Sequence, residues 1–247
     1  MRRRASACST VAAVGLMVAA LIRYATDTRP PLPSTPPIDP LFQYSLAASA
    51  LLADDRPLPE VRPAACKREY GPRSNLASLS STSVVVVEVN EAEPTLRRTL
   101  TSIIRRSPPS LLHEVIVIDD CSDWRVSDAV LDISDKISVL TNAQREGVVR
   151  SRLRGFAAST AQTVTFLDAH VEVNTFWLEP LLERVAAYPS TIVAPVIDVI
   201  HPQSFAYHAS AHRLRGGFDW DLNFRWVPAE RQSRWLQRPP LDAADKT

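Results

Sequence analysis

From Ser83 onward the chain alternates short β-branched runs with amphipathic helical patterns, and this alternation limits the folds open to it. The run SVVVVEV at residues 83–89 reads as a buried strand. The next pattern, EPTLRRTLTSIIRR at residues 93–106, has a helical apolar stripe and stops before two prolines. The stripe consists of Leu96, Leu100, Ile103 and Ile104. A strand is therefore expected to be followed by a helix packed on it.

The same alternation continues along the chain. Further strands are expected within residues 113–120, 136–140, 163–170 and 191–200, and further helices within residues 146–160 and 174–188. Strands that are apolar throughout and alternate with helices favour a mostly parallel sheet covered on both faces. The predicted fold class is therefore a Rossmann-like α/β fold.

Acidic residues and a histidine stand at the predicted carboxyl ends of two strands. Asp119 and Asp120 end the second strand pattern, and Asp168 and His170 end the pattern that begins at Thr163. Ligands of open parallel sheets bind outside the carboxyl ends of the strands, near the point where the strand order reverses. This placement makes these residues candidates for a binding site.

Two interpretations are open for the pair Asp168 and His170. An oxygen and a nitrogen donor two residues apart suit Mn²⁺ or a similar cation. The same spacing also occurs in ordinary capping turns. Asp119 and Asp120 are similarly open, since they either accept hydrogen bonds from a ribose or base or simply begin a turn.

Arg145 and Gly147 precede the helical pattern that starts near residue 148. An arginine near a helix N-terminus suits a phosphate or a uracil edge, and a glycine lets the backbone approach a ligand. Arg150 and Arg154, four residues apart, are more typical of a solvated helix face. The aromatic segment at residues 216–226 fits either core and rim or a substrate platform.

The N-terminus predicts a membrane anchor within residues 1–27. Residues 5–22 carry no charge and are about long enough to cross a membrane as a helix, between a cluster of arginines and Arg23. A cleaved signal peptide is the alternative, but the residues after the span form a poor cleavage site. Because the leading arginines favour the cytoplasmic side, the expected topology is single-pass type II with a lumenal domain.

Two segments connect the anchor to the first strand. Residues 28–40 are so rich in proline that an extended stem is expected. Residues 41–82 contain one short helical pattern and are interpreted as a packing arm.

Charge and cysteine content restrict the partners and the compartment. With 28 basic and 27 acidic residues the formal net charge is +1, which argues against a polyanion-binding surface and against nucleic acid as a partner. In an oxidising lumen Cys66 and Cys121 could pair, although their spacing does not show it.

Several segments in combination resemble the polypeptide N-acetylgalactosaminyltransferases, Golgi enzymes that begin mucin-type O-glycosylation. The segments are residues 83–122, 145–155 (REGVVRSRLRG), 165–185 (TFLDAHVEVNTFWLEPLLERV), 195–200 and 215–226. The resemblance spans about residues 41–230. It implies a GT-A fold, with residues 83–230 as the nucleotide-sugar-binding half, incomplete at its C-terminal side, and residues 231–247 as a divergent tail.

The resemblance also implies a reaction and roles for individual residues. The family transfers GalNAc from UDP-GalNAc to Ser or Thr of proteins with Mn²⁺ as cofactor. Asp168 and His170 match its metal-binding pair against the donor diphosphate. The nucleotide-sugar site is completed by Asp120 at the uridine, Arg145 and Gly147 in the pocket loop, and Val87 at the end of the first strand.

The chain also departs from the family pattern. Glu88 and Val89 stand where the family has Phe and His, and a carboxylate there is expected to repel the diphosphate. Val171 and Val173 replace two cysteines, and the family partner of Cys66 is absent. The chain ends at Thr247, before the family's third metal ligand, acceptor region and lectin domain.

These departures leave more than one function open. The first is an active Golgi transferase of the family type. The second is a catalytically inactive nucleotide-sugar-binding or regulatory member, and the third is a fragment of an incomplete gene model.

Overall fold

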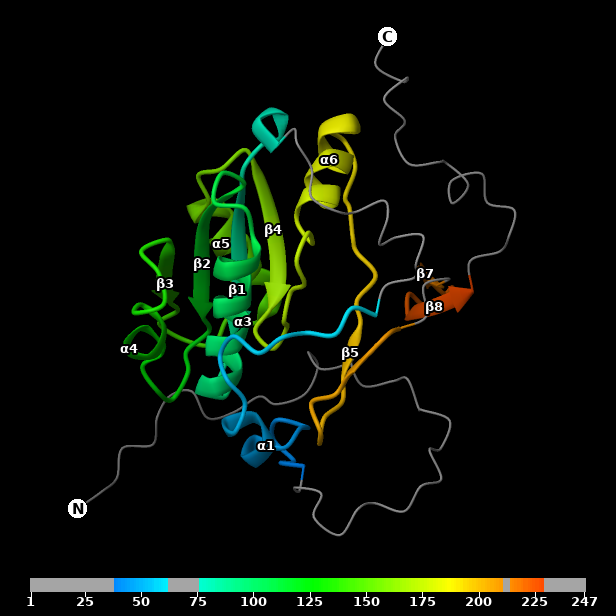
Figure 1. The fold of residues 1–247 in the computed structure, drawn as a ribbon. Helices are drawn as coiled ribbons and strands as arrows, with labels where there is room; N and C mark the ends of the chain where they lie inside the picture. Colours follow the sequence, from blue (N-terminus) through cyan, green and yellow to red (C-terminus); the bar gives the residue numbers. More distant parts are fainter. Residues whose placement is uncertain (1–37, 62–75, 211–213, 229–247) are drawn as a thin grey trace, which may run out of the picture.

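Four parallel strands form the sheet at the centre of the fold (Figure 1). The structure is a computed structural model that describes residues 38–61, 76–210 and 214–228. The strands pair in the order β3-β2-β1-β4. Their bounds are β1 (Thr82–Glu88), β2 (Leu112–Asp119), β3 (Ile137–Thr141) and β4 (Thr163–Asp168). The predicted parallel sheet is confirmed.

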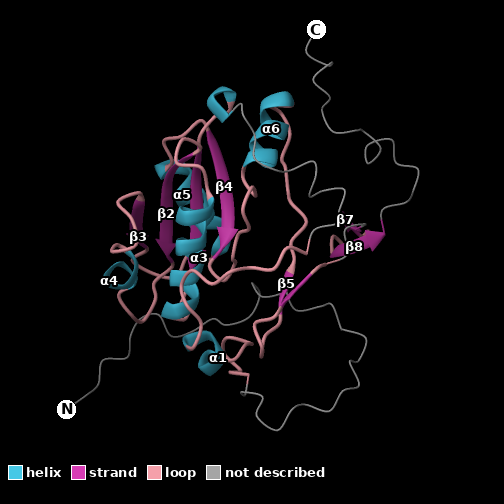
Figure 2. Ribbon diagram, viewed as in Figure 1, coloured by secondary structure: helices cyan, strands magenta, loops and turns pink. Residues whose placement is uncertain are grey.

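Helices cover both faces of this sheet, as the continuous apolar strands predicted. On one face Val84 and Val86 of β1 share a core cluster with residues of α3 (Glu93–Arg106), namely Leu96, Leu100 and Ile103. On the other face, Val85 packs with Ile116 and Ile118 beneath α5 (Val148–Ala158). Two more helices, α4 (Val126–Val130) and α6 (Glu179–Ala187), lie at the sides (Figure 2).

Gly155 allows α5 to approach the sheet closely. A Cβ atom at this position would lie 2.3 Å from Cγ1 of Val85, well inside van der Waals contact. The glycine is therefore required by packing rather than by backbone conformation.

The strand order reverses between β1 and β4. The chain adds β2 and β3 on one side of β1 and then returns to place β4 on its other side. Val87 is level with Asp168 of β4, and Glu88 is level with Asp119 of β2. The carboxyl ends of the three strands therefore meet at one edge, and the switch point lies between β1 and β4.

The region after β4 differs from the prediction. The helix expected at residues 174–188 begins only at Glu179, because Phe176 has a positive φ of 59°. In the run at residues 191–200 only β5 (Val199–Ile200) is strand, paired with β6 (Tyr207–His208). Pro195 interrupts this run and cannot donate to a ladder, which explains why the predicted strand fails.

The aromatic segment near the end forms a hairpin of β7 (Leu214–Phe218) and β8 (Phe224–Pro228). Trp220 at its turn is fully exposed. Of the two interpretations of this segment, core packing does not hold for Trp220.

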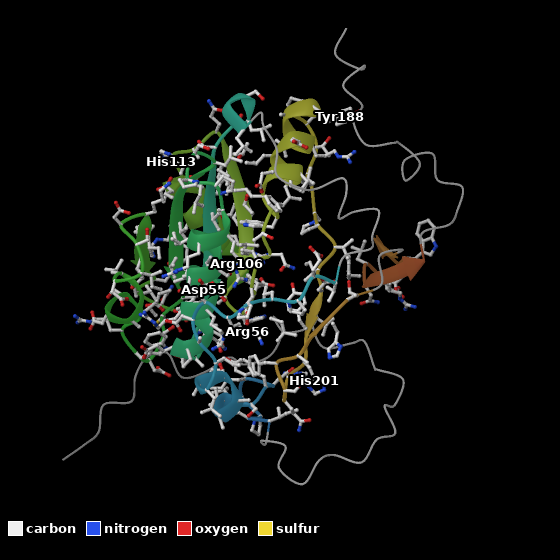
Figure 3. The ribbon with its side chains drawn as sticks, in the orientation of Figure 1. Asp55, Arg56, Arg106, His113, Tyr188 and His201 are labelled. Carbon is white, nitrogen blue, oxygen red and sulfur yellow. The ribbon has the colours of Figure 1, made fainter. Side chains whose placement is uncertain are left out.

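Residues 38–61, here called the arm segment, lie at the carboxyl edge of the sheet and contain α1 (Leu46–Ala50). Figure 3 shows Asp55 and Arg56 of the arm segment beside Arg106 of α3, while His113 and Tyr188 lie toward the opposite end. Nη2 of Arg106 donates to Asp55 Oδ1 at 3.1 Å and to the carbonyl oxygen of Arg56 at 2.6 Å. A short 3-10 turn (Leu76–Ser78) then leads into β1.

The predicted anchor and most of the predicted stem lie outside the described residues. Among the helices that the structure describes, none is long and apolar enough to cross a membrane. The anchor and the domain boundaries stay predictions.

Candidate functional site at the carboxyl edge of the sheet

Hydrogen bonds join the loops that follow β1 and β2. The side-chain amide of Asn90 donates to Asp123 Oδ2 at 3.0 Å, and the backbone N–H of Asp123 donates to Asn90 Oδ1 at 2.7 Å. The hydroxyl of Ser122 accepts from the backbone N–H of Asn90 at 2.9 Å. Asn90 and Cys121 both have positive φ, which turns the two loops toward each other. The loops after β1 and β2 are thus one connected unit.

Asp120 organises the loop that leads into α5. Its Oδ1 accepts from the Asn142 side chain at 2.6 Å and from the Glu146 N–H at 2.8 Å, and its Oδ2 accepts from the Gly147 N–H at 2.9 Å. Burial raises the pKa of this carboxyl, but the hydrogen bonds from Glu146, Asn142 and Gly147 outweigh burial and lower the pKa. Asp120 is therefore an anionic anchor for the predicted nucleotide loop.

The loop held by Asp120 presents Arg145 and Gly147. Gly147 has φ of 86°, a left-handed conformation that favours glycine, and its carbonyl accepts the Ser151 N–H at the start of α5. Arg145 is exposed, and its Nη2 lies 3.4 Å from the Cys121 carbonyl oxygen. Val87 is half-buried among apolar side chains at the end of β1. The structure thus brings Arg145 and Gly147 together beside Asp120. Val87 instead packs among the apolar side chains of the sheet.

Asp168 and His170 lie at the end of β4, beside the switch point. The Asp168 side chain is 59% exposed, and its Oδ1 is 3.1 Å from Nη2 of Arg152 on α5. Nδ1 of His170 is 3.0 Å from Oε2 of Glu91 in the loop after β1. This hydrogen bond raises the pKa of His170, burial opposes it, and the charges of Glu91 and Asp168 add to the increase. Of the two predicted ligands, Asp168 therefore pairs with a base and His170 with an acid.

The loop after β4 is tied along its length to α3. The hydroxyl of Thr99 donates to the Ala169 carbonyl at 2.8 Å, and the Ser102 hydroxyl accepts from the Val173 N–H at 3.1 Å. Both α3 side chains are buried. A polar stripe of α3 thus lies next to the apolar stripe and fixes the loop that carries His170.

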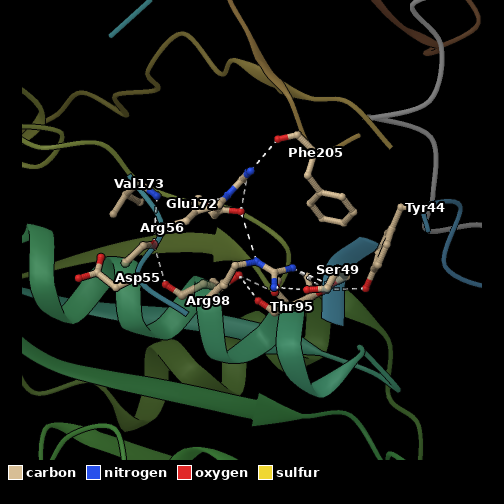
Figure 4. A network of polar contacts seen from close by, with 12 residues as sticks. Tyr44, Ser49, Asp55, Arg56, Thr95, Arg98, Glu172, Val173 and Phe205 are labelled. Atoms are coloured by element: carbon tan, nitrogen blue, oxygen red, sulfur yellow. Dashed lines mark hydrogen bonds and ion pairs between the residues drawn. The ribbon is translucent and has the colours of Figure 1, made fainter. Parts of the chain in front are cut away.

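Glu172 links the same loop to the arm segment through buried charges (Figure 4). Its carboxylate accepts from Nε of Arg56 at 2.8 Å and from Nη2 of Arg56 at 3.0 Å, and it lies 3.5 Å from Nε of Arg98. Arg98 in turn donates to the Ser49 carbonyl at 2.8 Å, and both guanidinium groups lie over the ring of Phe205. Such bidentate pairing holds the arm segment, α3 and the loop after β4 in one arrangement.

Sequence reasoning did not identify Glu91, Arg98, Thr99 or Glu172 as part of the site. The available signal was the spacing of polar residues on the helix at residues 93–106. Thr95, Arg98 or Thr99, and Ser102 recur every three or four residues, which predicts a second contact face.

Glu88 does not behave as the sequence predicted. Its side chain is 2% exposed, and its Oε1 accepts from the Ser122 hydroxyl at 2.7 Å. Burial, with a smaller contribution from Asp119, raises the pKa of Glu88 to about 8 although the Ser122 hydrogen bond opposes the shift. Glu88 is therefore buried and largely protonated at neutral pH. The expectation that it repels a diphosphate is wrong, because the side chain does not carry the negative charge that repulsion requires.

Cys121 takes part in a disulfide bond. Cys66, the residue with which the sequence allows it to pair, lies outside the described residues. The bond fixes the positive-φ residue directly after Asp120.

Comparison with known proteins agrees with this geometry. Residues 83–241, more than half of the chain, match the family model described as glycosyl transferase family 2. The chain belongs to glycosyl transferase family 2. Within this family, human polypeptide N-acetylgalactosaminyltransferase 13 is 44% identical over 195 residues, which cover 77% of this chain and 34% of the relative. Human polypeptide N-acetylgalactosaminyltransferase 16 is 41% identical over 198 residues, covering 78% and 35%.

A solved structure supports the same relationship. The crystal structure of GalNAc-T7 with UDP, GalNAc and Mn²⁺ matches with a TM-score of 0.71 and 27% identity, covering 83% of this chain and 41% of that chain. The predicted resemblance and the GT-A-like α/β fold are therefore confirmed for this family 2 member. The chain spans about a third of the length of the curated relatives it matches.

The residues at β4 fit a divalent metal as a partial site. In the part of the chain that the structure describes, no three His, Cys, Asp or Glu side chains form a cluster. Asp168 and His170 offer one oxygen and one nitrogen donor, a set that suits Mn²⁺. The carboxylate of Glu91 on His170 is the outer partner that ligating histidines usually have.

Proposed function

We propose that this chain binds UDP-GalNAc at the carboxyl edge of the sheet and supplies the donor-binding part of a polypeptide N-acetylgalactosaminyltransferase. The observation that carries the proposal is the meeting of two elements at this edge. Asp120 holds the loop of Arg145 and Gly147, and β4 presents Asp168 and His170 beside the switch point. The curated relatives and the GalNAc-T7 complex support UDP-GalNAc as the donor.

In this proposal, different residues bind different parts of the donor. Arg145 and the N-terminal turn of α5, which has no acidic residue, attract the negatively charged nucleotide. Asp168 and His170 would hold Mn²⁺, which when bound neutralises charge on the departing diphosphate. The buried connections from α3 keep the loop of His170 in place, so the binding groups are oriented before the donor arrives.

Transfer to a protein is the second part of the proposal. The acceptor is a Ser or Thr hydroxyl of a polypeptide, as the names of the relatives indicate for those proteins. We also propose a Golgi location with a type II anchor, on the basis of residues 5–22. Donor binding, transfer and location are separate claims, and the inactive nucleotide-sugar-binding member stays the alternative to transfer.

Calorimetric titration of UDP into the full-length protein tests donor binding, with Mn²⁺ and again with chelator. We expect binding that depends on Mn²⁺ in the wild type and is lost in Asp168→Ala. Asp135→Ala, which removes an exposed aspartate before β3, should bind like the wild type. Failure of the folded wild type to bind UDP with Mn²⁺ would refute the proposal.

A transfer assay then separates an enzyme from a binding module. Radiolabelled UDP-GalNAc and a Ser/Thr-rich peptide are incubated with the wild type and with Asp168→Ala. Incorporation into the peptide only with the wild type supports transfer, whereas UDP binding without incorporation supports the non-catalytic alternative.

A further inference from the structure

One ring nitrogen of His170 is already engaged by the protein. Its Nδ1 lies 3.0 Å from Oε2 of Glu91. A carboxylate can only accept a hydrogen bond, so Nδ1 must carry the proton in this contact. In the neutral ring the lone pair is then on Nε2, which is the atom left to bind a ligand.

Glu91 is itself fixed by the arm segment. Its side chain is 10% exposed. Its Oε1 accepts from the Tyr44 hydroxyl at 2.5 Å and from the Ala92 N–H at 3.0 Å. The Tyr44 oxygen also lies 2.9 Å from Oγ1 of Thr95 on α3. Both carboxylate oxygens thus have partners, and only one of these contacts involves His170.

We propose that Glu91 and Tyr44 are positioning residues that set the tautomer and orientation of His170 for a divalent cation. This inference rests on the proposed function, because it assigns a supporting role at the same metal site. It extends the site 126 residues back along the chain, from His170 to Tyr44 in the arm segment. Outer partners of ligating histidines commonly affect metal affinity roughly 10–100-fold, so the effect is measurable.

The alternative is that Glu91 only stabilises the start of α3. It directly precedes Ala92, the N-cap residue of that helix. A purely structural role would lower stability but leave the affinity of the folded protein for a metal unchanged. Metal affinity and histidine tautomer therefore separate the two roles.

The first experiment titrates Mn²⁺ alone into the full-length protein by calorimetry. Glu91→Ala should weaken binding roughly 10–100-fold. Glu91→Gln should weaken it less, because the amide oxygen still accepts the Nδ1 proton. Tyr44→Phe should weaken it only a few-fold, because Glu91 keeps its contact with His170.

Matched controls come from the opposite end of the sheet. Glu114 accepts hydrogen bonds from Ser83 and Thr160, far from the loop after β4. Glu114→Gln repeats the loss of charge, and Tyr188→Phe repeats the loss of a half-buried phenol hydroxyl. Both variants should bind Mn²⁺ like the wild type. Weakening by these controls equal to that of the test variants would overturn the inference.

The second experiment reads the tautomer directly by nitrogen-15 NMR of His170 in metal-free protein. The wild type should show Nδ1 protonated and Nε2 unprotonated above the pKa of the ring, and Glu91→Ala should shift the population toward Nε2–H. Wild-type Mn²⁺ affinity and tautomer in folded Glu91→Ala would overturn the inference.

Asp168→Ala makes failure of this inference distinguishable from failure of the proposed function. If Asp168→Ala loses Mn²⁺ while the Glu91 variants keep it, the proposed function stands and the positioning role fails. If the wild type binds no Mn²⁺, the proposed metal site fails and this inference fails with it.

Discussion

Asp120 and Asp168 stand at comparable places, at the carboxyl ends of β2 and β4, but the protein surrounds them differently. Asp120 is buried and accepts three hydrogen bonds from the loop before α5. The Asp168 side chain is 59% exposed and pairs only with Arg152 among the contacts described for it. The first carboxylate fixes the loop before α5, whereas the second has most of its acceptor capacity free for a ligand. One edge of the sheet thus combines a preformed side with an open side.

The strongest way to test this contrast is to remove each carboxylate. Asp120→Ala should lower the free energy of unfolding by about 3 kcal/mol, because the buried amide of Asn142 and two loop N–H groups lose their acceptor. Asp168→Ala should change it by less than about 0.5 kcal/mol. Urea unfolding of both variants measures the difference. Equal losses would show that the two aspartates do not differ in their structural role.

The buried side of the edge should also show a pH dependence of stability that comes from Glu88. Because folding raises the pKa of Glu88 to about 8, its contribution to stability is fully present below the pKa of the unfolded chain. That contribution is lost as pH rises through about 8. Glu88→Gln, which imitates the protonated form, should reduce the fall in unfolding free energy between pH 5 and pH 8 by on the order of 2 kcal/mol. Urea unfolding at several pH values checks this, and an unchanged slope would contradict it.

The smallest effect is expected at the open side. Arg152→Gln removes the cation that pairs with Asp168, and exposed pairs contribute little to stability. The free energy of unfolding should change by less than about 0.5 kcal/mol, while Mn²⁺ affinity should rise a few-fold because a competing positive charge is gone. Thermal unfolding and calorimetry provide both numbers. Weaker Mn²⁺ binding would instead indicate that Arg152 positions Asp168.

The sequence predicted those elements whose pattern is local. The apolar stripe of α3 and the β-branched runs of β1 and β2 show in the sequence which of their residues are buried. The parallel sheet could therefore be expected. The run at residues 191–200 has a similar composition, but Pro195 interrupts it, and only Val199 and Ile200 pair with another described strand. Ile192 is left 98% exposed. Composition indicates a strand, whereas pairing decides whether one forms.

The position of the site could be predicted from the sequence, but the residues that hold it in place could not. Asp168 and His170 could be placed because strand ends meet at one edge. The contacts of Glu91 with Tyr44 and of Glu172 with Arg56 join residues 47 and 116 positions apart. Contacts over such separations depend on how the arm segment folds back, and no local pattern encodes that. The burial of Glu88 depends in the same way on the neighbouring loop of β2.

Helix α5 runs from the loop that Asp120 holds to the close packing contact of Gly155 with the sheet. Gly155 rests on Val85 with no room for a side chain, and Gly147 stands just before the first turn of the same helix. At 1.5 Å per residue the two glycines are separated by roughly 12 Å along the axis. Because a helix moves as a stiff unit, even a methyl group at position 155 would push α5 away from Val85 and displace the loop that Asp120 holds. Mutational sensitivity of the proposed nucleotide loop should therefore extend to Gly155 at the other end of α5.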